Sequence, residues 1–224
     1  MEIIVVGAGR MAREILSAFR GPLAIEVTEW VAAAESAKPS IVIHAGSGRE
    51  LDEVIAFCER TNSFLVEVAT GSAIENREVR FPVVLCPNTN ILMLKFMVMM
   101  ARSGDLFKGC KIQLTESHQT AKTSTPGTAV GVARSLGLPS SEIQSVRDPV
   151  EQAQVLGIPE EHLSRHAYHH IEIQDGQTSL TLETRVFDKA PYAAGVAKIV
   201  AVLGAHPLEP RIYNVSEFIE NGWL

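Results

Sequence analysis

The chain has 224 residues, a formal net charge of −6 and an apolar fraction of 46%. Its length suits about one or two domains, and its ordinary charged fraction of 21% excludes a disordered or fibrous protein. The acidic balance disfavours nucleic acid as a partner, since nucleic-acid binding needs a basic surface. Three widely spaced cysteines and the lack of any membrane-length apolar run predict a cytoplasmic protein without disulfides and without a membrane partner.

The first 90 residues alternate strand-like and helix-like patterns. Strands are expected at 3–6, 23–27, 40–44, 64–68 and 82–85, and helices at 10–20 and 50–60. The run Ile3–Val6 is continuously apolar and β-branched, which is typical of a strand buried on both faces. This alternation predicts a parallel sheet with helices on both sides.

The pattern changes after residue 90. A buried helix is expected at 91–100, followed by a strand at 111–115, a helix at 128–136, strands at 166–173 and 178–186 around a hairpin at 174–177, and a helix from Pro191. The fold class is therefore α/β, with a Rossmann dinucleotide-binding domain at 1–93 plus 206–224. A second α+β domain with a mixed sheet, for substrate binding and oligomerisation, is expected at 94–205. Its segment 139–162 is long enough to suggest a functional or interface role.

A glycine fingerprint, Gly7-Ala8-Gly9-Arg10-Met11-Ala12, directly follows the first strand and opens a helix. Gly7 permits a tight turn, and Gly9 lets a pyrophosphate approach the backbone at the helix start. Glu29 follows Gly9 by about 20 residues, the spacing of an acid that holds ribose hydroxyls, and Glu26 is close by. These features predict dinucleotide binding, with an ordinary tight turn as the alternative. Because no basic residue closely follows Glu29, NADH is favoured over NADPH, although Arg10 could meet a 2′-phosphate.

A polar stretch after the predicted strand at 111–115 carries a second group of reactive side chains. The strand is expected to end at Glu116, a loop then carries His118 and Lys122, and Pro126-Gly127 turn the chain into a helix. A histidine can donate a proton, a lysine supplies positive charge, and a helix N-terminus attracts a carboxylate. The stretch therefore predicts a site that holds and protonates an acidic substrate.

These residues together resemble the dihydrodipicolinate reductase family. Gly9-Arg10-Met11 matches its fingerprint, Glu116, His118 and Lys122 stand at its spacing, and residues 126–129 (PGTA) echo its next segment. The resemblance implies His118 as general acid, Lys122 as the residue that holds or protonates the substrate, and Gly127 and Thr128 as carboxylate ligands. It also implies cofactor contacts from two further loops, Ala69-Thr70-Gly71 and Pro87-Asn88, beside Gly7, Gly9, Arg10, Met11 and Glu29.

Three departures from the family pattern fall in the substrate segment. Gln119 replaces a substrate-contacting histidine, although it can still donate a hydrogen bond. Ser124 stands where the family has aspartate, and one serine before Gly127 is missing. We therefore expect reduction of dihydrodipicolinate (4-hydroxy-tetrahydrodipicolinate) to tetrahydrodipicolinate, in lysine and diaminopimelate biosynthesis, by an NAD(P)H-dependent oxidoreductase. A related imine reductase with a different substrate and a non-catalytic dinucleotide sensor are the alternatives, and the resemblance implies a homotetramer.

Four histidines lie close together in the sequence, at 162–170, and could indicate a metal site. At helical spacing His162, His166 and His169 would share one face. The alternation continued by Ile171 predicts a strand instead, which sends neighbouring histidines to opposite faces. We therefore expect no metal, and either a substrate-facing or a surface role for His166 and His170.

Overall fold

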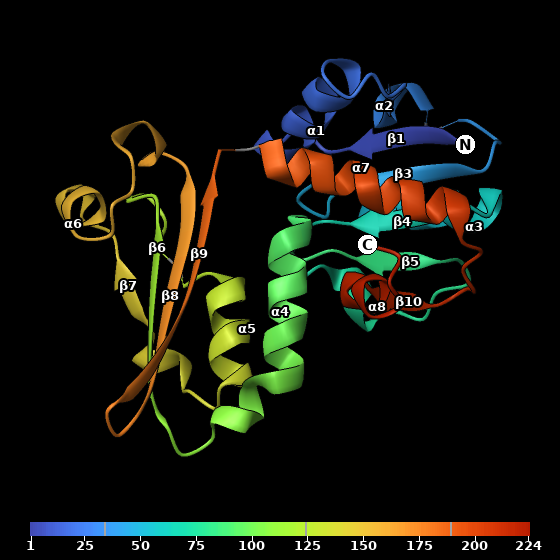
Figure 1. The fold of residues 1–224 in the computed structure, drawn as a ribbon. Coiled ribbons are helices and arrows are strands. Elements are labelled where there is room, and N and C mark those ends of the chain that lie inside the picture. Colours follow the sequence, from blue (N-terminus) through green and yellow to red (C-terminus); the bar gives the residue numbers. More distant parts are fainter. Residues whose placement is uncertain (34, 124, 189) are drawn as a thin grey trace. The chain divides into compact units, whose positions relative to one another are not determined.

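The computed structural model describes residues 1–33, 35–123, 125–188 and 190–224 (Figure 1). The chain divides into two compact units, unit 1 with residues 1–94 and 190–224, and unit 2 with residues 95–189. The boundary expected at residue 205 is wrong, because helix α7 (Ala190–Ala205) packs against α1 (Arg10–Arg20) and shares the hydrophobic core of unit 1.

Unit 1 is built on a six-stranded parallel sheet with the order β10-β5-β4-β3-β1-β2. The strands are β1 (Glu2–Val6), β2 (Thr28–Glu29), β3 (Ser40–His44), β4 (Phe64–Glu67), β5 (Val83–Leu85) and β10 (Ile212–Asn214). Helices α1, α7 and α8 (Val215–Glu220) pack on one face, and α2 (Trp30–Ala33) and α3 (Leu51–Thr61) on the other. The expected Rossmann-like fold is confirmed.

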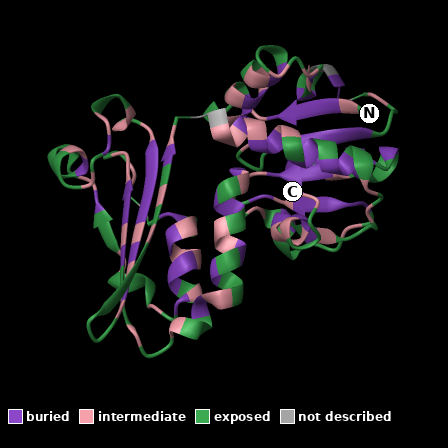
Figure 2. Cartoon of the chain, in the orientation of Figure 1, coloured by how far each residue is buried: buried purple, intermediate pink, exposed green. Residues whose placement is uncertain are grey.

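The strand β1 shows why the first apolar run is continuous. Ile3 and Val5 belong to the core under α1 and α7, whereas Ile4 and Val6 belong to the core under α3. Both faces are thus covered, and the strands of this sheet are largely buried (Figure 2). A strand in this position needs apolar side chains at every residue.

The strand expected at 23–27 is displaced. Ala24 has a φ of 49°, a conformation that interrupts an extended strand. The backbone N–H of Ile25 donates to the Phe19 carbonyl, which closes a turn after α1. Pairing with β1 therefore begins only at Thr28, and Glu29 ends the strand opposite Val5.

Unit 2 is built on a mixed four-stranded sheet with the order β7-β6-β8-β9. Strand β6 (Lys111–His118) runs parallel to β7 (Gln144–Val146) and antiparallel to β8 (His166–Asp175), which pairs with β9 (Thr178–Phe187). The β8–β9 pairing closes through Gly176, whose φ of 57° suits the expected hairpin. The core lies between one face of this sheet and the helices α4 (Ile91–Ser103) and α5 (Gly127–Ser135).

Two expectations for unit 2 need correction. Helix α4 is not buried all round, because Leu92 and Met99 are exposed while Leu94 and Met100 enter hydrophobic cores. The segment 139–162 is regular rather than a long loop, since it contains β7, α6 (Pro149–Gln154) and two 3₁₀ turns, η3 (Ser140–Glu142) and η4 (Glu160–His162). Asp148 caps α6 by accepting hydrogen bonds from the backbone N–H groups of Val150 and Glu151. Two more 3₁₀ turns are η1 (Ala73–Asn76) and η2 (Gly104–Phe107).

In the described part of the chain, no helix combines the length and apolarity that a membrane crossing needs. The cytoplasmic location stays a prediction.

Candidate active site

The glycine turn after β1 has the geometry of a phosphate cradle. Gly7 has a φ of 116°, and a Cβ there would lie 2.7 Å from the Ala45 carbonyl oxygen. A Cβ at Gly9 would come no closer than 3.9 Å to that oxygen, so the space above Gly9 is open. Gly9 caps α1 without any side-chain hydrogen bond, and the first turn of α1 holds no acidic residue. The donor groups and positive end of the helix dipole therefore suit a phosphate group.

A cavity of about 430 Å³ lies beside this turn. The chain's strand order reverses between β1 and β3, and the loops after these two strands line the cavity. Parallel α/β sheets bind ligands at this kind of switch point. The lining residues are Gly7, Ala8, Gly9, Ala45, Gly46, Ser47, Arg49 and Glu50.

Arg10 and Met11 follow in the first turn of α1, where Arg10 is exposed and Met11 packs partly against the core. The acid expected after the second strand, Glu29, is exposed at the end of β2. Its Oε1 lies 3.1 Å from Nη2 of Arg20, at the end of α1. A basic side chain thus stands next to Glu29 in space. This pair could not be predicted from the sequence, because Arg20 precedes Glu29 by nine residues and lies in a different element.

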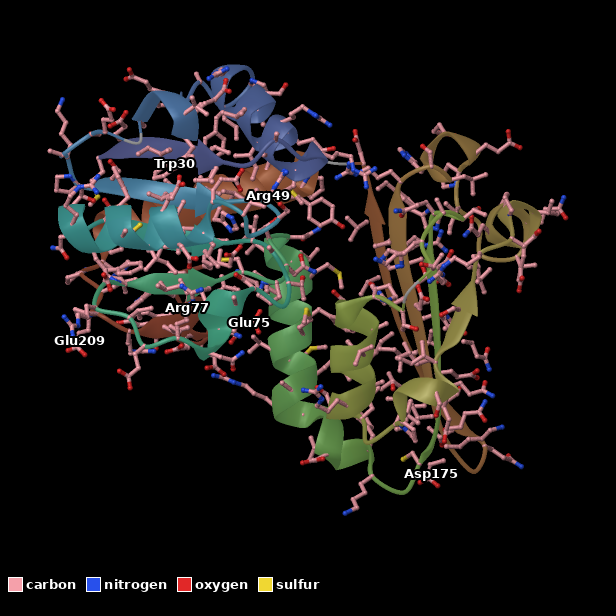
Figure 3. All side chains as sticks on the ribbon, turned by 180° about the vertical axis from the view of Figure 1, so that it is seen from behind. Trp30, Arg49, Glu75, Arg77, Asp175 and Glu209 are labelled. Atoms are coloured by element: carbon pink, nitrogen blue, oxygen red, sulfur yellow. The ribbon has the colours of Figure 1, made fainter. Side chains whose placement is uncertain are left out.

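A second cavity in unit 1, of about 470 Å³, lies along the loops after β3 and β4. Ala69, Thr70 and Gly71 line it, as the family resemblance predicts for a cofactor loop. Pro87 and Asn88 follow β5 at the same edge of the sheet, where the Asn88 side chain accepts a hydrogen bond from the Asn90 backbone. Arg49 and Arg77, which line the first and second cavities, are labelled in Figure 3.

A buried contact between a histidine and a glutamate shapes the loop after β4. The Nδ1 atom of His44 lies 2.7 Å from Glu67 Oε2, and both side chains are fully buried. Glu67 also accepts hydrogen bonds from the Ala69 backbone N–H and the Ser72 hydroxyl, at 2.9 and 2.8 Å. Glu67 therefore fixes the conformation of residues 69–72. His44 also lines the second cavity.

In unit 2, strand β6 carries both Glu116 and His118. The expected end of the strand at Glu116 is wrong, because pairing with β8 continues to His118 opposite Ala167. Leu114, Glu116 and His118 share one face, since side chains alternate along a strand. His118 Nδ1 lies 2.8 Å from Glu116 Oε2, and the Glu116 side chain is fully buried.

Arg147 and Ser145, from the segment after α5, complete this pair. Arg147 Nη2 donates to Glu116 Oε1 at 2.6 Å, and the Ser145 hydroxyl donates to the same oxygen. Burial by itself would raise the pKa of Glu116, but the hydrogen bonds from His118, Arg147 and Ser145 outweigh it and lower the pKa to about 2. The carboxylate is therefore ionised at neutral pH.

Two further histidines of β8 lie beside His118. The rings of His118 and His169 meet edge to face with centroids 5.8 Å apart, and the ring of His166 stacks on His118 at 6.5 Å. Burial lowers the pKa of His169 to about 4, so this imidazole is neutral at pH 7. His166 bonds the Ser117 hydroxyl through Nε2, and burial lowers its pKa as well. His170 faces the other side of the sheet, near Glu183.

The expected substrate residues surround the loop after β6. The Lys122 backbone N–H donates to the Gln119 carbonyl, and Arg147 Nε donates to the Lys122 carbonyl, each at 2.9 Å. Gly127 begins α5, and its cap residue Pro126 offers no side-chain hydrogen bond. A Cβ at Gly127 would meet no atom within 4 Å, and Thr128 is half-buried. Ser124, a departure from the family pattern, lies outside the described residues.

The fully described part of the chain holds no group of three or more His, Cys, Asp or Glu side chains arranged to bind a metal ion. The four histidines at 162–170 therefore bring no ligand cluster together there. His166, His169 and His170 lie in β8, where the neighbours His169 and His170 take opposite faces as the strand alternation predicts, whereas His162 ends the 3₁₀ turn η4.

Comparison with known proteins finds relatives that are named reductases. A curated 4-hydroxy-tetrahydrodipicolinate reductase 2 of Arabidopsis thaliana is 35% identical over 126 residues, which are 52% of this chain and 36% of that protein. The chain is a relative of the dihydrodipicolinate reductase family. A probable reductase 1 of Oryza sativa subsp. japonica is 37% identical over 128 residues, 52% of this chain and 37% of that protein. The chain thus spans little more than a third of these curated dihydrodipicolinate reductases. No protein-family model matches it.

Solved structures agree with the reductase family at the level of the fold. A dipicolinate-bound dihydrodipicolinate reductase from Paenisporosarcina sp. TG-14 has a TM-score of 0.69 at 15% identity, over 97% of this chain and 99% of that one. A DAP dehydrogenase of C. glutamicum in complex with DAP has a TM-score of 0.52 at 10% identity, over 97% and 93%. The family resemblance found in the sequence is confirmed.

Sequence reasoning missed Arg147, Ser145, Arg20 and the His44–Glu67 pair. The contact between Glu116 and His118 did have a signal in the sequence. Residues two apart on a strand share a face, and this spacing places Glu116 beside His118. Arg147 lies 31 residues from Glu116. The contact between Arg147 and Glu116 depends on the parallel pairing of β6 with β7, which the sequence pattern does not predict.

Proposed function

We propose that this protein reduces dihydrodipicolinate, which forms from 4-hydroxy-tetrahydrodipicolinate by loss of water, to tetrahydrodipicolinate with NADH or NADPH. In this proposal unit 1 binds the dinucleotide and unit 2 binds and protonates the dicarboxylate. The observation that carries it is the buried contact of His118 with the ionised Glu116, on a strand that leads directly to Lys122 and α5. Support also comes from the names of the curated relatives.

The residues of unit 1 fit a dinucleotide. The open space above Gly9, the uncapped start of α1 and the adjoining cavity suit a pyrophosphate. Glu29 would hold the ribose hydroxyls, Arg10 and Met11 would flank the phosphates, and residues 69–71 with Pro87 and Asn88 would line the remainder of the site. The nicotinamide, when bound, would supply a hydride.

The residues of unit 2 provide for the proton and the negative charge of the substrate. Reduction of a conjugated imine adds one hydride and one proton, and the dinucleotide leaves oxidised. His118 would supply the proton from Nε2, because its Nδ1 faces Glu116. Lys122 would neutralise a carboxylate, and Gly127 and Thr128 would bind one at the start of α5.

The substrate pocket differs from the family pattern at Gln119, which carries no charge. An uncharged amide binds a carboxylate less strongly than a protonated imidazole does. A second candidate function is therefore reduction of a related cyclic imine with fewer or differently spaced carboxylates.

The test measures NADH and NADPH oxidation with freshly prepared dihydrodipicolinate. Turnover that follows the substrate concentration is the expected result. Turnover with another cyclic imine only would select the second candidate. Dinucleotide binding without turnover of any imine would contradict both and would point to a sensor.

We also propose a homo-oligomer, tetrameric as the family resemblance implies. In unit 2 one sheet face carries polar residues on neighbouring strands, of which Gln113 and Thr181 are exposed and Glu172 is half-buried. A polar sheet face of this kind can pair with a copy of itself. Light scattering on the purified protein would give the mass of a tetramer, and a monomer mass would contradict the proposal.

A further inference from the structure

The two oxygens of Glu116 have different partners. Oε1 accepts hydrogen bonds from Arg147 Nη2 and the Ser145 hydroxyl, whereas Oε2 faces Nδ1 of His118 at 2.8 Å. An ionised carboxylate only accepts hydrogen bonds. The hydrogen in the contact with His118 must therefore sit on Nδ1, and a neutral His118 then has its lone pair on Nε2.

Arg147 holds this carboxylate from a fixed position. Besides the bond to Glu116, Arg147 Nε donates to the Lys122 carbonyl and Nη1 donates to the Val146 carbonyl, each at 2.9 Å. Its own carbonyl accepts from the Thr120 hydroxyl at 2.9 Å. Each of the three guanidinium nitrogens thus donates a hydrogen bond, and the Arg147 side chain is mostly buried. This arginine therefore links Glu116 to the loop that carries Lys122.

The same segment also holds the backbone of His118. The Gln152 side-chain amide donates to the His118 carbonyl at 2.8 Å and to the Val146 carbonyl at 3.2 Å. Gln152 is completely buried at the end of α6. The segment 139–162 thus fixes both the main chain and the ring partner of His118.

We propose that Glu116, held by Arg147, is a positioning residue that keeps His118 in the Nδ1–H tautomer. Nε2 is then the atom that takes up a proton and delivers it to the substrate. This inference rests on the proposed function only for the delivery step, since the tautomer is a property of the protein alone.

Among the side chains that face the His118 ring, Glu116 is the charged partner. From β8, the rings of His166 and His169 face His118, and burial lowers the pKa of both, so neither carries a stable positive charge near neutral pH. From the segment after β7, Arg147 reaches His118 only through the carboxylate. Glu116 on β6 therefore decides which ring nitrogen carries the hydrogen.

The substitution Glu116→Gln tests the assignment sharply. Arg147 can only donate, so it orients the oxygen of the introduced amide towards itself and the NH₂ group towards His118. That NH₂ group donates to Nδ1 and forces the hydrogen onto Nε2. We expect the side-chain ¹⁵N resonances of His118 to switch from the Nδ1–H to the Nε2–H pattern. We expect kcat to fall by about 10²- to 10⁴-fold, as for loss of a positioned general acid, with NADH affinity unchanged.

Three variants accompany this test. Glu183→Gln removes the same charge from a carboxylate that bonds Arg185 and Tyr168 on the opposite face of the same sheet, and it should leave the His118 resonances unchanged. Arg147→Lys keeps a donor and a positive charge, so it should retain the Nδ1–H tautomer and lose less activity than Arg147→Met. The side-chain ¹⁵N resonances of His118 in the wild type, which should show the Nδ1–H pattern, cover the case in which Glu116→Gln does not fold.

The outcomes separate the inference from the proposed function. An Nε2–H pattern of the His118 resonances in the wild type, or unchanged His118 resonances in Glu116→Gln, would overturn the inference even if the wild type reduces dihydrodipicolinate. A tautomer switch would support it, whether or not dihydrodipicolinate is the substrate. A wild type without turnover would refute the proposed function alone.

Discussion

His118 and Lys122 are expected to act differently although they share one loop. A general acid acts mainly in the transition state, whereas a lysine that neutralises a carboxylate also binds the ground state. The two side chains leave the chain four residues apart, His118 from the buried end of β6 and Lys122 from the turn that follows. Their substitutions should therefore separate kcat from KM.

His118→Gln should lower kcat and kcat/KM together by about 10²- to 10⁴-fold, with KM for the imine little changed. Lys122→Ala should raise KM as well as lower kcat. Steady-state kinetics with the imine measure both, and NADH titration provides the control, since the dinucleotide affinity should stay as in the wild type. Near-normal kinetics in both variants would mean that the loop is only a polar connection.

Cofactor choice depends on Glu29 and its neighbour Arg20. The carboxylate of Glu29 should hold ribose hydroxyls and repel a 2′-phosphate, so NADH should be at least as good as NADPH in kcat/KM. In Glu29→Ala the guanidinium of Arg20, now 3.1 Å from that carboxylate, is released. The ratio of kcat/KM for NADPH over NADH should therefore rise, whereas Arg20→Ala should not raise it. A strong NADPH preference in the wild type would instead assign the phosphate to Arg10.

At the scale of elements, the start of α1 should be a phosphate site that tolerates only a small side chain. Gly9→Asp places a carboxylate where the pyrophosphate would lie, without a steric clash in the protein, because the nearest atom to a Cβ there is 3.9 Å away. NADH binding should be lost while the circular dichroism spectrum and the melting temperature stay close to wild type. NADH affinity within about threefold of wild type, about 0.6 kcal/mol, would contradict the assignment. Gly9→Ala is the neutral control and should bind more tightly than Gly9→Asp.

The packing of α7 on the loop before α4 depends on Gly195. A Cβ at this position would overlap the Thr89 carbonyl oxygen, which is backbone and cannot move aside alone. Gly195→Ala should therefore lower the free energy of unfolding by about 1–3 kcal/mol. Gly204→Ala on the same helix is the matched control. A Cβ there meets no atom within 4 Å, so this change should stabilise the protein by about 0.4–1 kcal/mol. Equal urea midpoints for the two variants would contradict the packing argument.

At the scale of the whole molecule, acid should destabilise the protein through unit 2. The unfolded chain protonates His169 near its ordinary pKa of 6.5, whereas burial and the neighbouring His118 keep the folded imidazole neutral down to about pH 4. The unfolded state therefore binds more protons than the folded state in this window. The free energy of unfolding decreases as the pH is lowered from 6.5 to about 4, by about 3 kcal/mol in total. Glu116 adds a loss below its ordinary pKa of 4.5, because its folded pKa is about 2.

The substitution His169→Gln should flatten this pH dependence between about pH 6.5 and 4. Urea unfolding followed by circular dichroism at several pH values gives the free energy of unfolding for both proteins. Tryptophan fluorescence reports on unit 1, which contains Trp30 and Trp223, and thus shows whether the two units unfold together. A variant with the same slope as the wild type would mean that His169 does not control the acid response.

The parallel sheet of unit 1, the glycine turn and the family resemblance could be predicted from the sequence, because these depend on local features. Alternation, apolar runs and glycine spacing are properties of neighbouring residues, and backbone sterics convert them directly into strands and turns. The hairpin between β8 and β9 was predictable for the same reason. The histidines at 166–170 were correctly assigned to a strand, since their polarity does not hide the alternation of Ala167, His169 and Ile171.

The contacts that join distant segments became visible only in the folded structure. Helix α7 belongs to unit 1 because its apolar side packs against α1. The sequence of α7 predicts an apolar side but not the element against which it packs. Arg147 reaches Glu116 because β7 pairs in parallel with β6, and Arg20 reaches Glu29 because the chain turns at Ala24. Such contacts depend on which elements pack together, and the free energy of that choice comes from burial summed over the whole core rather than from any short pattern.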